Sequence, residues 1–338
     1  MPDGAPGGRA ALGRVVRSTL QIGYARFVAV SAEPKPSSRS RALCAAVSSA
    51  SAESLGATAS RIDSWILLEY RGMWDRDVLG ASLLPEGMKR HIREQLHELR
   101  PSRLLFLKKP ERRAHARRRV WFGTSKPGEE RFFKLEVDHL EDLREFDFAA
   151  ALSGAGTPGV PLDHPLLVVC THGKRDRCCA KNGRPLYDAL RRETETDRVW
   201  QSTHVGGDRF AGNVVVFPHG LYYGRVEPGE VGSLLAANAA GRIDLERYRG
   251  RAAYTFPVQA AEHAIREAEG LLGIGDLALV RSRATAEDRW RVRLRGEAGV
   301  YEVDVEAELA DEPVFLTCGA AEPTRPRHFR ATAIRRVR

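Results

Sequence analysis

The order of apolar segments between residues 165 and 240 limits the possible fold more than any other feature of this 338-residue chain. "PLLVVC" (165–170) predicts a buried strand, a helix is expected over 179–192, and "RVWQST" (198–203) predicts a second strand. A helical crossover of this kind places its two strands parallel in one sheet. "NVVVFP" and "LYYGRV" then predict a hairpin, and 228–240 predicts another helix.

A strand–helix–strand unit followed by a hairpin and a helix is the layout of a thioredoxin-like domain, which we place at residues 156–245. The Gly/Pro-rich segment "SGAGTPGVPLDHP" separates it from an expected α/β domain at 43–155, which contains the apolar strand "SWILLEY". A helix over 256–272 and the strands "LALVRSR", "RWRVRLRG", "VYEVDVEAEL" and "PVFLTC" predict a small α+β domain at 250–338. The fold class expected is therefore α/β (α+β overall).

The ends of the chain and its cysteine content bear on location. Residues 1–42 are rich in Gly, Ala, Ser and Arg and predict a flexible leader, although this composition also fits an organellar transit peptide. The longest apolar runs are too short to span a bilayer. Five unevenly placed cysteines do not resemble the disulfide framework of a secreted protein. We expect a cytoplasmic protein without a membrane segment.

The chain is basic, with a formal net charge of +9 and a pI near 9.5. Part of the excess lies in "KKPERRAHARRR" (108–119), where no aromatic residue interrupts the cations and no zinc-finger, KH or RRM signature accompanies them. Such a run by itself gives only nonspecific attraction to nucleic acid. An acidic redox partner, either a reductase or an acceptor, would be attracted equally well, so we expect that partner and no specific nucleic acid.

The cysteines and one histidine are expected to meet at one edge of the sheet. Cys170 ends the first strand, Cys178 and Cys179 open the next helix, and His204 follows the second strand. The carboxyl ends of parallel strands lie at the same edge, where open α/β sheets bind ligands. Topology therefore brings these four residues together despite their separation along the chain.

The loop after His204 contains two further features of a cofactor site, a glycine pair and an aspartate. The pair Gly206–Gly207 lets the backbone turn tightly and approach a cofactor closely. Asp208 follows the pair, four positions after the histidine, and offers a carboxylate at the same edge.

Three chemistries compete for this site. A thiol–disulfide centre normally uses C-x-x-C at a helix start, a motif that this sequence lacks. A zinc site normally takes two pairs of closely spaced ligands, and only His204 and Asp208 have such spacing. A [2Fe–2S] cluster accepts thiolates and imidazoles from separated loops. Cys170 and Cys179 on one iron, with His204 and a neighbour on the other, would fit it.

The motifs "CTHGKRDRCC", "THVGGDRFAGNVVVFPHGLYYGRV" and "EPVFLTCGAAEP" resemble the sucrase/ferredoxin-like family. The likeness covers most of the chain from about Cys44. Better-understood members are thioredoxin-like [2Fe–2S] proteins with two cysteines nine positions apart and two histidines in an H-x-G-G-H loop. The resemblance implies that Cys170 and Cys179 are thiolate ligands and that His204 is the first imidazole ligand.

This chain departs from the family pattern at Asp208, which stands where the second histidine is expected. A carboxylate ligand adds negative charge and should lower the reduction potential relative to a two-histidine site. Cys178 is the alternative fourth ligand. The function expected is one-electron transfer by a [2Fe–2S] protein rather than catalysis. The alternatives are a cluster-free thiol–disulfide redox protein of thioredoxin-like fold and a basic nucleic-acid-binding module.

Overall fold

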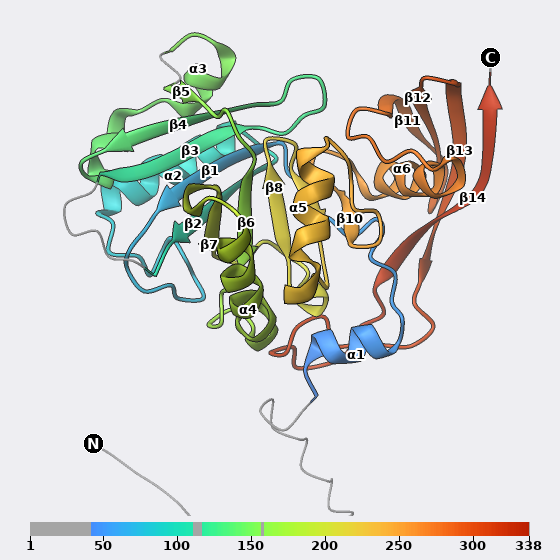
Figure 1. Cartoon of the computed structure of the whole chain (residues 1–338), viewed down its shortest axis with the longest axis horizontal. Helices are drawn as coiled ribbons and strands as arrows, with labels where there is room; N and C mark the ends of the chain where they lie inside the picture. The colour runs from blue at the N-terminus through green and yellow to red at the C-terminus, as the bar shows by residue number, and fades with distance from the viewer. Residues whose placement is uncertain (1–41, 111–116, 157–158, 338) are drawn as a thin grey trace, which may run out of the picture. The chain divides into compact units, whose positions relative to one another are not determined.

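A computed structural model describes residues 42–110, 117–156 and 159–337 (Figure 1). The expected leader at 1–42 lies outside the described residues apart from its last position. Ten of the described strands form one sheet in the order β10-β9-β8-β6-β7-β2-β1-β3-β4-β5. None of the helices in the described ranges combines the length and apolar character that spanning a bilayer requires.

The middle of this sheet has the predicted strand–helix–strand unit. β6 and β7 are parallel and are joined by α4, so that Cys170 and Ser202 are register partners at the ends of the two strands. β8 runs antiparallel to β6 and forms a hairpin with β9. The bounds are β6 (Leu166–Cys170), α4 (Arg177–Glu193), β7 (Val199–Ser202), β8 (Val214–Phe217), β9 (Leu221–Tyr223) and α5 (Val231–Ala239). The resulting order β9-β8-β6-β7 is thioredoxin-like, and the predicted α/β class is confirmed.

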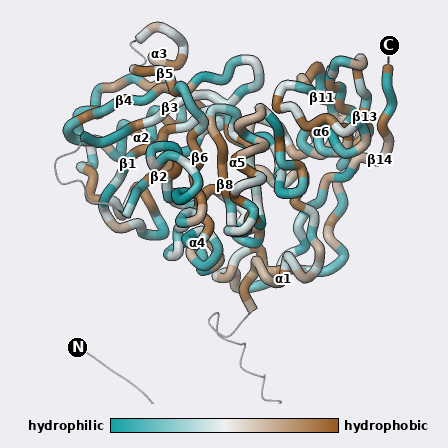
Figure 2. The backbone as a smooth tube through the Cα atoms, in the orientation of Figure 1, coloured by the Kyte–Doolittle hydropathy of each residue, from teal (hydrophilic) through white to brown (hydrophobic). Residues whose placement is uncertain are grey.

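Burial on both faces explains why these strands are almost wholly apolar. α4 and α5 cover one face of β6 and β8 (Figure 1). On this face Leu186 and Leu234 belong to the same apolar cluster as Val169 and Val216. The opposite face packs around Trp65 and other aromatic residues. The hydropathy pattern follows this arrangement, with β8 hydrophobic along its length (Figure 2). A strand buried on both faces reads as a continuous apolar run, as expected.

The strands of the N-terminal segment extend the same sheet. β1 is parallel to β2 and antiparallel to β3, and β3 pairs antiparallel with β4. The two segments join where β2 pairs with β7. The bounds are α1 (Cys44–Ala50), β1 (Ser64–Glu69), α2 (Glu86–Glu98), β2 (Ser102–Lys108), β3 (Arg118–Thr124), β4 (Arg131–Val137), α3 (Phe148–Ser153), β5 (Val160–Pro161) and β10 (Tyr248–Arg251).

The C-terminal segment packs α6 against a second sheet in the order β11-β12-β13-β14. The predicted strand over 313–318 is wrong. Val314 forms only an isolated bridge with Thr324, and the chain instead makes a loop that buries Cys318. The fourth strand is the arginine-rich β14. The bounds are α6 (Phe256–Glu269), β11 (Ala278–Ala286), β12 (Arg289–Gly296), β13 (Gly299–Leu309) and β14 (Arg327–Val337).

Candidate metal centre

Three of the predicted ligands lie together at the carboxyl edge of β6 and β7. Cys170 ends β6, Cys179 lies in the first turn of α4, and His204 follows β7. One ligand atom from each, two sulfurs and a ring nitrogen, lie within 4.8 Å of one another. Both cysteines are buried, whereas the His204 side chain is 22% exposed. Together they form a group that could hold a metal and that reaches the surface through the imidazole.

Asp208 completes the group from the side of the histidine. Its Oδ1 atom lies 2.9 Å from His204 Nδ1 and accepts a hydrogen bond of 3.1 Å from Cys179 Sγ. The carboxylate is buried and begins a short 3-10 helix over Asp208–Phe210. It therefore contacts one sulfur and the ring nitrogen, as a fourth ligand or a direct neighbour of the ligands would.

Gly206 and Gly207 shape the loop 204–208, which we call the histidine loop. Their φ angles are +104° and +77°, a region that favours glycine. A Cβ atom on Gly207 would overlap the guanidinium of Arg249. The glycine pair thus allows the loop to turn and to pack directly against a buried arginine, rather than contributing ligand atoms.

The ionisable side chains of this group shift the pKa values of one another. The hydrogen bond with Cys179 and the nearby His204 ring lower the pKa of Cys170 to about 5, against the effect of burial. The same contact with Cys170, together with burial, raises the pKa of the Cys179 thiol. Burial alone would lower the pKa of His204, but the Asp208 carboxylate and the Cys170 sulfur raise it to about 9. At neutral pH the metal-free site therefore holds a Cys170 thiolate beside a His204 imidazolium.

Arg249 is a functional neighbour that the sequence did not reveal. Its side chain is buried and donates hydrogen bonds to the Gly206 carbonyl at 3.1 Å and to Asn213 Oδ1 at 2.8 Å. It also donates to the hydroxyl and carbonyl oxygens of Thr58. Asn213 in turn donates to the Gly207 carbonyl at 2.9 Å. These two side chains therefore help to fix the histidine loop, together with Ser60, Arg103 and Tyr222, which donate hydrogen bonds to the Val205 carbonyl.

The structure places Cys178 in a different group. Its sulfur lies 3.5 Å from that of Cys44 and 3.4 Å from that of Cys318, and Asp176 lies beside them. Cys178 and Cys179 are adjacent in α4, so their side chains leave the helix in different directions. The expectation that Cys178 joins Cys170 and His204 is therefore not met, because its sulfur faces the N- and C-terminal segments instead.

The fold and this group define an α/β protein that carries a candidate Cys/Cys/His metal centre with the Asp208 carboxylate beside it. The profile described as sucrase/ferredoxin-like matches residues 55–250, more than half of the chain. The chain belongs to the sucrase/ferredoxin-like family.

Similar proteins include altered inheritance of mitochondria protein 32 from Meyerozyma guilliermondii, 38% identical over 128 residues, which cover 35% of this chain and 43% of that protein. The protein of the same name from Debaryomyces hansenii is 35% identical over 96 residues, covering 25% and 35% respectively. The matches thus span less than half of the length of these curated relatives. Among solved structures, a thioredoxin-like [2Fe–2S] ferredoxin from Aquifex aeolicus aligns with 27% of this chain and 94% of its own length, at 19% identity and a TM-score of 0.24.

Proposed function

We propose that this chain is a one-electron carrier that binds a [2Fe–2S] cluster at the candidate metal centre. Cys170 and Cys179 would bind one iron through their thiolates, and His204 and Asp208 would bind the other. The observation that supports the proposal is the convergence of two sulfurs and a ring nitrogen within 4.8 Å at one sheet edge, from residues far apart in the sequence. The protein's role is electron transfer rather than catalysis of its own.

The residues fit the proposed cluster in their chemistry. Thiolate and imidazole are ligand types that biological [2Fe–2S] clusters use. Cys170 is held as a thiolate, the form that binds iron, because its pKa is about 5. A bound cluster supplies one-electron redox chemistry, and the surrounding protein sets its potential and access. The buried cysteines exclude water, and the partly exposed His204 gives electrons a short path to the surface.

We also propose that the redox partner is a protein with an acidic docking surface. Exposed cations surround the start of α4, next to the centre: Lys174, Arg177, Lys181 and Arg184. Such a surface would steer an acidic reductase or acceptor towards His204 at a rate that falls with ionic strength. The basic run 108–119 is described only in part. Within it, Lys109 and Arg119 both pair with Asp197, at 3.0 and 2.8 Å.

Iron and acid-labile sulfide analysis of anaerobically purified protein tests the cluster. We expect about two of each per chain and an electron paramagnetic resonance signal on reduction. His204→Ala should remove nitrogen coupling from the signal, whereas Asp208→Ala should keep it. Cys170→Ser should lose the cluster, and Cys318→Ser, a matched cysteine change outside the centre, should keep it. Wild-type protein with neither iron nor sulfide would contradict the proposal.

A second candidate function is thiol–disulfide exchange by Cys170 and Cys179 without a cluster. The low pKa of Cys170 beside a second thiol favours it, because thiolate is the attacking species in exchange. The burial of both sulfurs opposes it, since a substrate disulfide must reach one of them. Disulfide reduction by iron-free protein, lost in Cys170→Ser, would favour this function over electron transfer.

We propose a reducing compartment, the cytoplasm, as the location. All five cysteines are free and buried, and the cluster ligands would need to stay reduced until iron is bound. The name of the fungal relatives refers to mitochondria, so imaging of the tagged full-length chain in cells with mitochondrial and cytoplasmic markers is the direct test.

A further inference from the structure

Three cysteines from distant parts of the chain meet at the start of α4. Cys44 opens α1, Cys178 lies in the first turn of α4, and Cys318 lies in the loop between β13 and β14 (Figure 1). Their sulfurs form a nearly equilateral triangle with sides of 3.5 Å (44–178), 3.4 Å (178–318) and 3.6 Å (44–318). All three side chains are buried. We call this group, together with Asp176, the second thiol cluster.

We propose that the second thiol cluster is a structural Zn²⁺ site, with Cys44, Cys178 and Cys318 as thiolate ligands and Asp176 as the fourth ligand. With Zn–S bonds of about 2.3 Å, tetrahedral geometry sets neighbouring sulfurs about 3.8 Å apart. The observed sides of the triangle are within about 0.4 Å of this value. Three sulfurs and an oxygen, with no position left for substrate, are typical of a closed structural site.

The triangle fits a single tetrahedral ion better than it fits a disulfide or an iron–sulfur cluster. A disulfide joins two sulfurs at about 2.05 Å and would leave the third cysteine apart, whereas these three are equally spaced. In an iron–sulfur cluster each cysteine binds a different iron or shares one with a single other cysteine, so three cysteine sulfurs do not all surround one point. A single tetrahedral ion satisfies all three contacts at once.

Asp176 lies where the fourth ligand is required. Both of its carboxylate oxygens are 4.0 Å from Cys44 Sγ, and the ligand atoms of all four residues lie within 4.8 Å of one another. The backbone amides of Cys178 and Cys318 donate to the carboxylate at 2.8 and 2.6 Å and fix its orientation. These donors are neutral, so a bound cation would supply the positive charge that a buried carboxylate requires.

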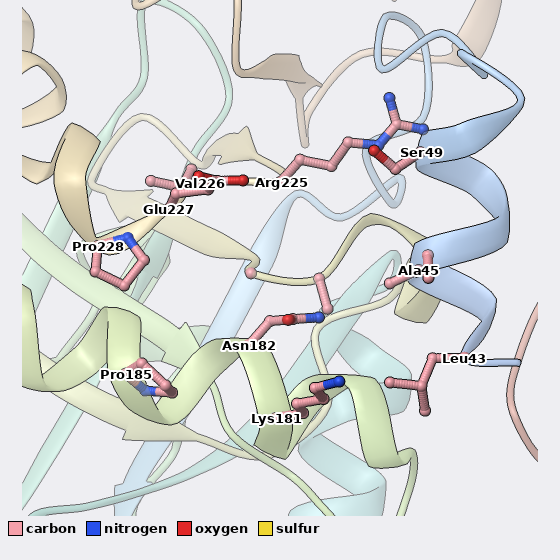
Figure 3. A pocket seen from close by; sticks show the side chains of 13 residues that line it. Leu43, Ala45, Ser49, Lys181, Asn182, Pro185, Arg225, Val226, Glu227 and Pro228 are labelled. Carbon is pink, nitrogen blue, oxygen red and sulfur yellow. The ribbon is translucent and has the colours of Figure 1, made fainter.

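A cavity of about 340 Å³ lies beside the cluster. Leu43 and Ala45, the neighbours of Cys44, face Lys181 and Asn182 of α4 across it (Figure 3). Leu43 and Ala45 also pack in the same apolar group as the three cysteines. The four proposed ligands are not among the residues that line this cavity, so the cluster is enclosed by protein and lies behind the residues that flank Cys44.

The location of the cluster indicates its role. It connects the start of the described chain, the helix of the thioredoxin-like unit and a C-terminal loop, which are 134 and 140 positions apart. It shares no ligand with the candidate iron centre, because Cys178 belongs to one group and Cys179 to the other. Zinc would thus hold the terminal segments against α4 independently of the iron–sulfur cluster.

Metal analysis of the full-length protein and two cysteine variants tests the proposal. Wild type should contain about one zinc per chain, and Co²⁺ exchanged into the site should give the intense visible absorption of thiolate-ligated tetrahedral cobalt. Cys318→Ser should reduce zinc at least tenfold and keep its iron. The matched variant Cys170→Ser should lose iron and keep its zinc.

X-ray absorption at the zinc edge of wild type should show three sulfurs and one oxygen, and it does not depend on whether Cys318→Ser folds. Three results would each overturn the proposal: wild type that binds neither Zn²⁺ nor Co²⁺ as isolated or after reconstitution, a disulfide among these cysteines in anaerobically purified protein, or equal zinc loss in Cys170→Ser. Because iron is counted separately, failure of the zinc site and failure of the proposed cluster remain distinguishable.

Discussion

Arg249→Met removes the side chain that fastens the histidine loop to β10. The methionine keeps an apolar stem over Phe210 and Tyr222, whose ring centroids lie 5.0 and 5.4 Å from the guanidinium carbon. The four hydrogen bonds from the guanidinium to Thr58, Gly206 and Asn213 are lost. The variant therefore separates polar anchoring of the loop from packing against the aromatic rings.

Two opposing contributions set the expected magnitude. Each hydrogen bond from a charged donor contributes at least about 1.5 kcal/mol to the free energy of unfolding, so the four bonds together contribute about 6 kcal/mol. Burial lowers the pKa of Arg249 from 12.5 to about 10, which costs the folded state about 3 kcal/mol that methionine does not incur. We expect the free energy of unfolding to fall by about 3 kcal/mol, a size typical of breaking a buried polar contact. Because the loop carries His204 and Asp208, metal affinity should fall roughly 10- to 100-fold.

Urea unfolding of the metal-free chain measures the first quantity, and iron titration followed by visible absorbance measures the second. Arg251→Met is the matched control, because Arg251 is also a buried arginine of β10 but contacts Glu130 and the Ile274 carbonyl. It should lose stability and keep its iron affinity. Equal iron affinity in wild type and Arg249→Met, or equal loss in both variants, would refute the assigned role of Arg249.

Three further changes probe the centre directly. Asp208→His should raise the reduction potential of the proposed cluster, because it replaces a carboxylate with a neutral ligand. An unchanged potential in a redox titration would contradict ligation by Asp208. In metal-free protein, ultraviolet absorbance should show a Cys170 thiolate forming near pH 5, because the pKa of this thiol is lowered. His204→Ala should move this transition to higher pH. A wild-type midpoint at the usual cysteine value of about 8.5 would rule out the charge pair of Cys170 and His204. Gly207→Ala should lower the free energy of unfolding in urea by more than about 1 kcal/mol, because the φ angle of Gly207 is +77°. Gly229→Ala, whose added Cβ would meet no atom within 4 Å, should change stability little. Similar results for the two variants would count against strain in the histidine loop.

The sequence predicts those parts of the fold and site that follow from local periodicity and strand topology. Apolar runs identify β6 and β7, and the crossover between them brings Cys170 and His204 to the same edge. The extent of α4 is predicted to within two residues at each end. These features depend on neighbouring positions and on a general rule for parallel strands, so a single sequence suffices for them.

Features that depend on contacts between distant segments are not predictable in this way. No local rule brings Cys44 and Cys318 to Cys178, because they lie 134 and 140 positions away along the chain. The apolar run 313–318 reads as a strand, but only Cys318 of this run is buried, where it packs in the group with Cys44 and Cys178. Arg249 lies in "YRGR", a pattern that equally fits an exposed strand, and only tertiary packing shows that its charge is enclosed.

The segment matched by the family profile, residues 55–250, excludes both Cys44 and Cys318. A fragment trimmed to those limits would retain Cys178 without the two thiols that enclose it, adjacent in sequence to Cys179, a proposed iron ligand. Incorrect iron loading and intermolecular cross-linking are the expected faults of such a fragment. Expression work on this family should therefore set its boundaries by the sulfur contacts that flank α4 rather than by sequence similarity.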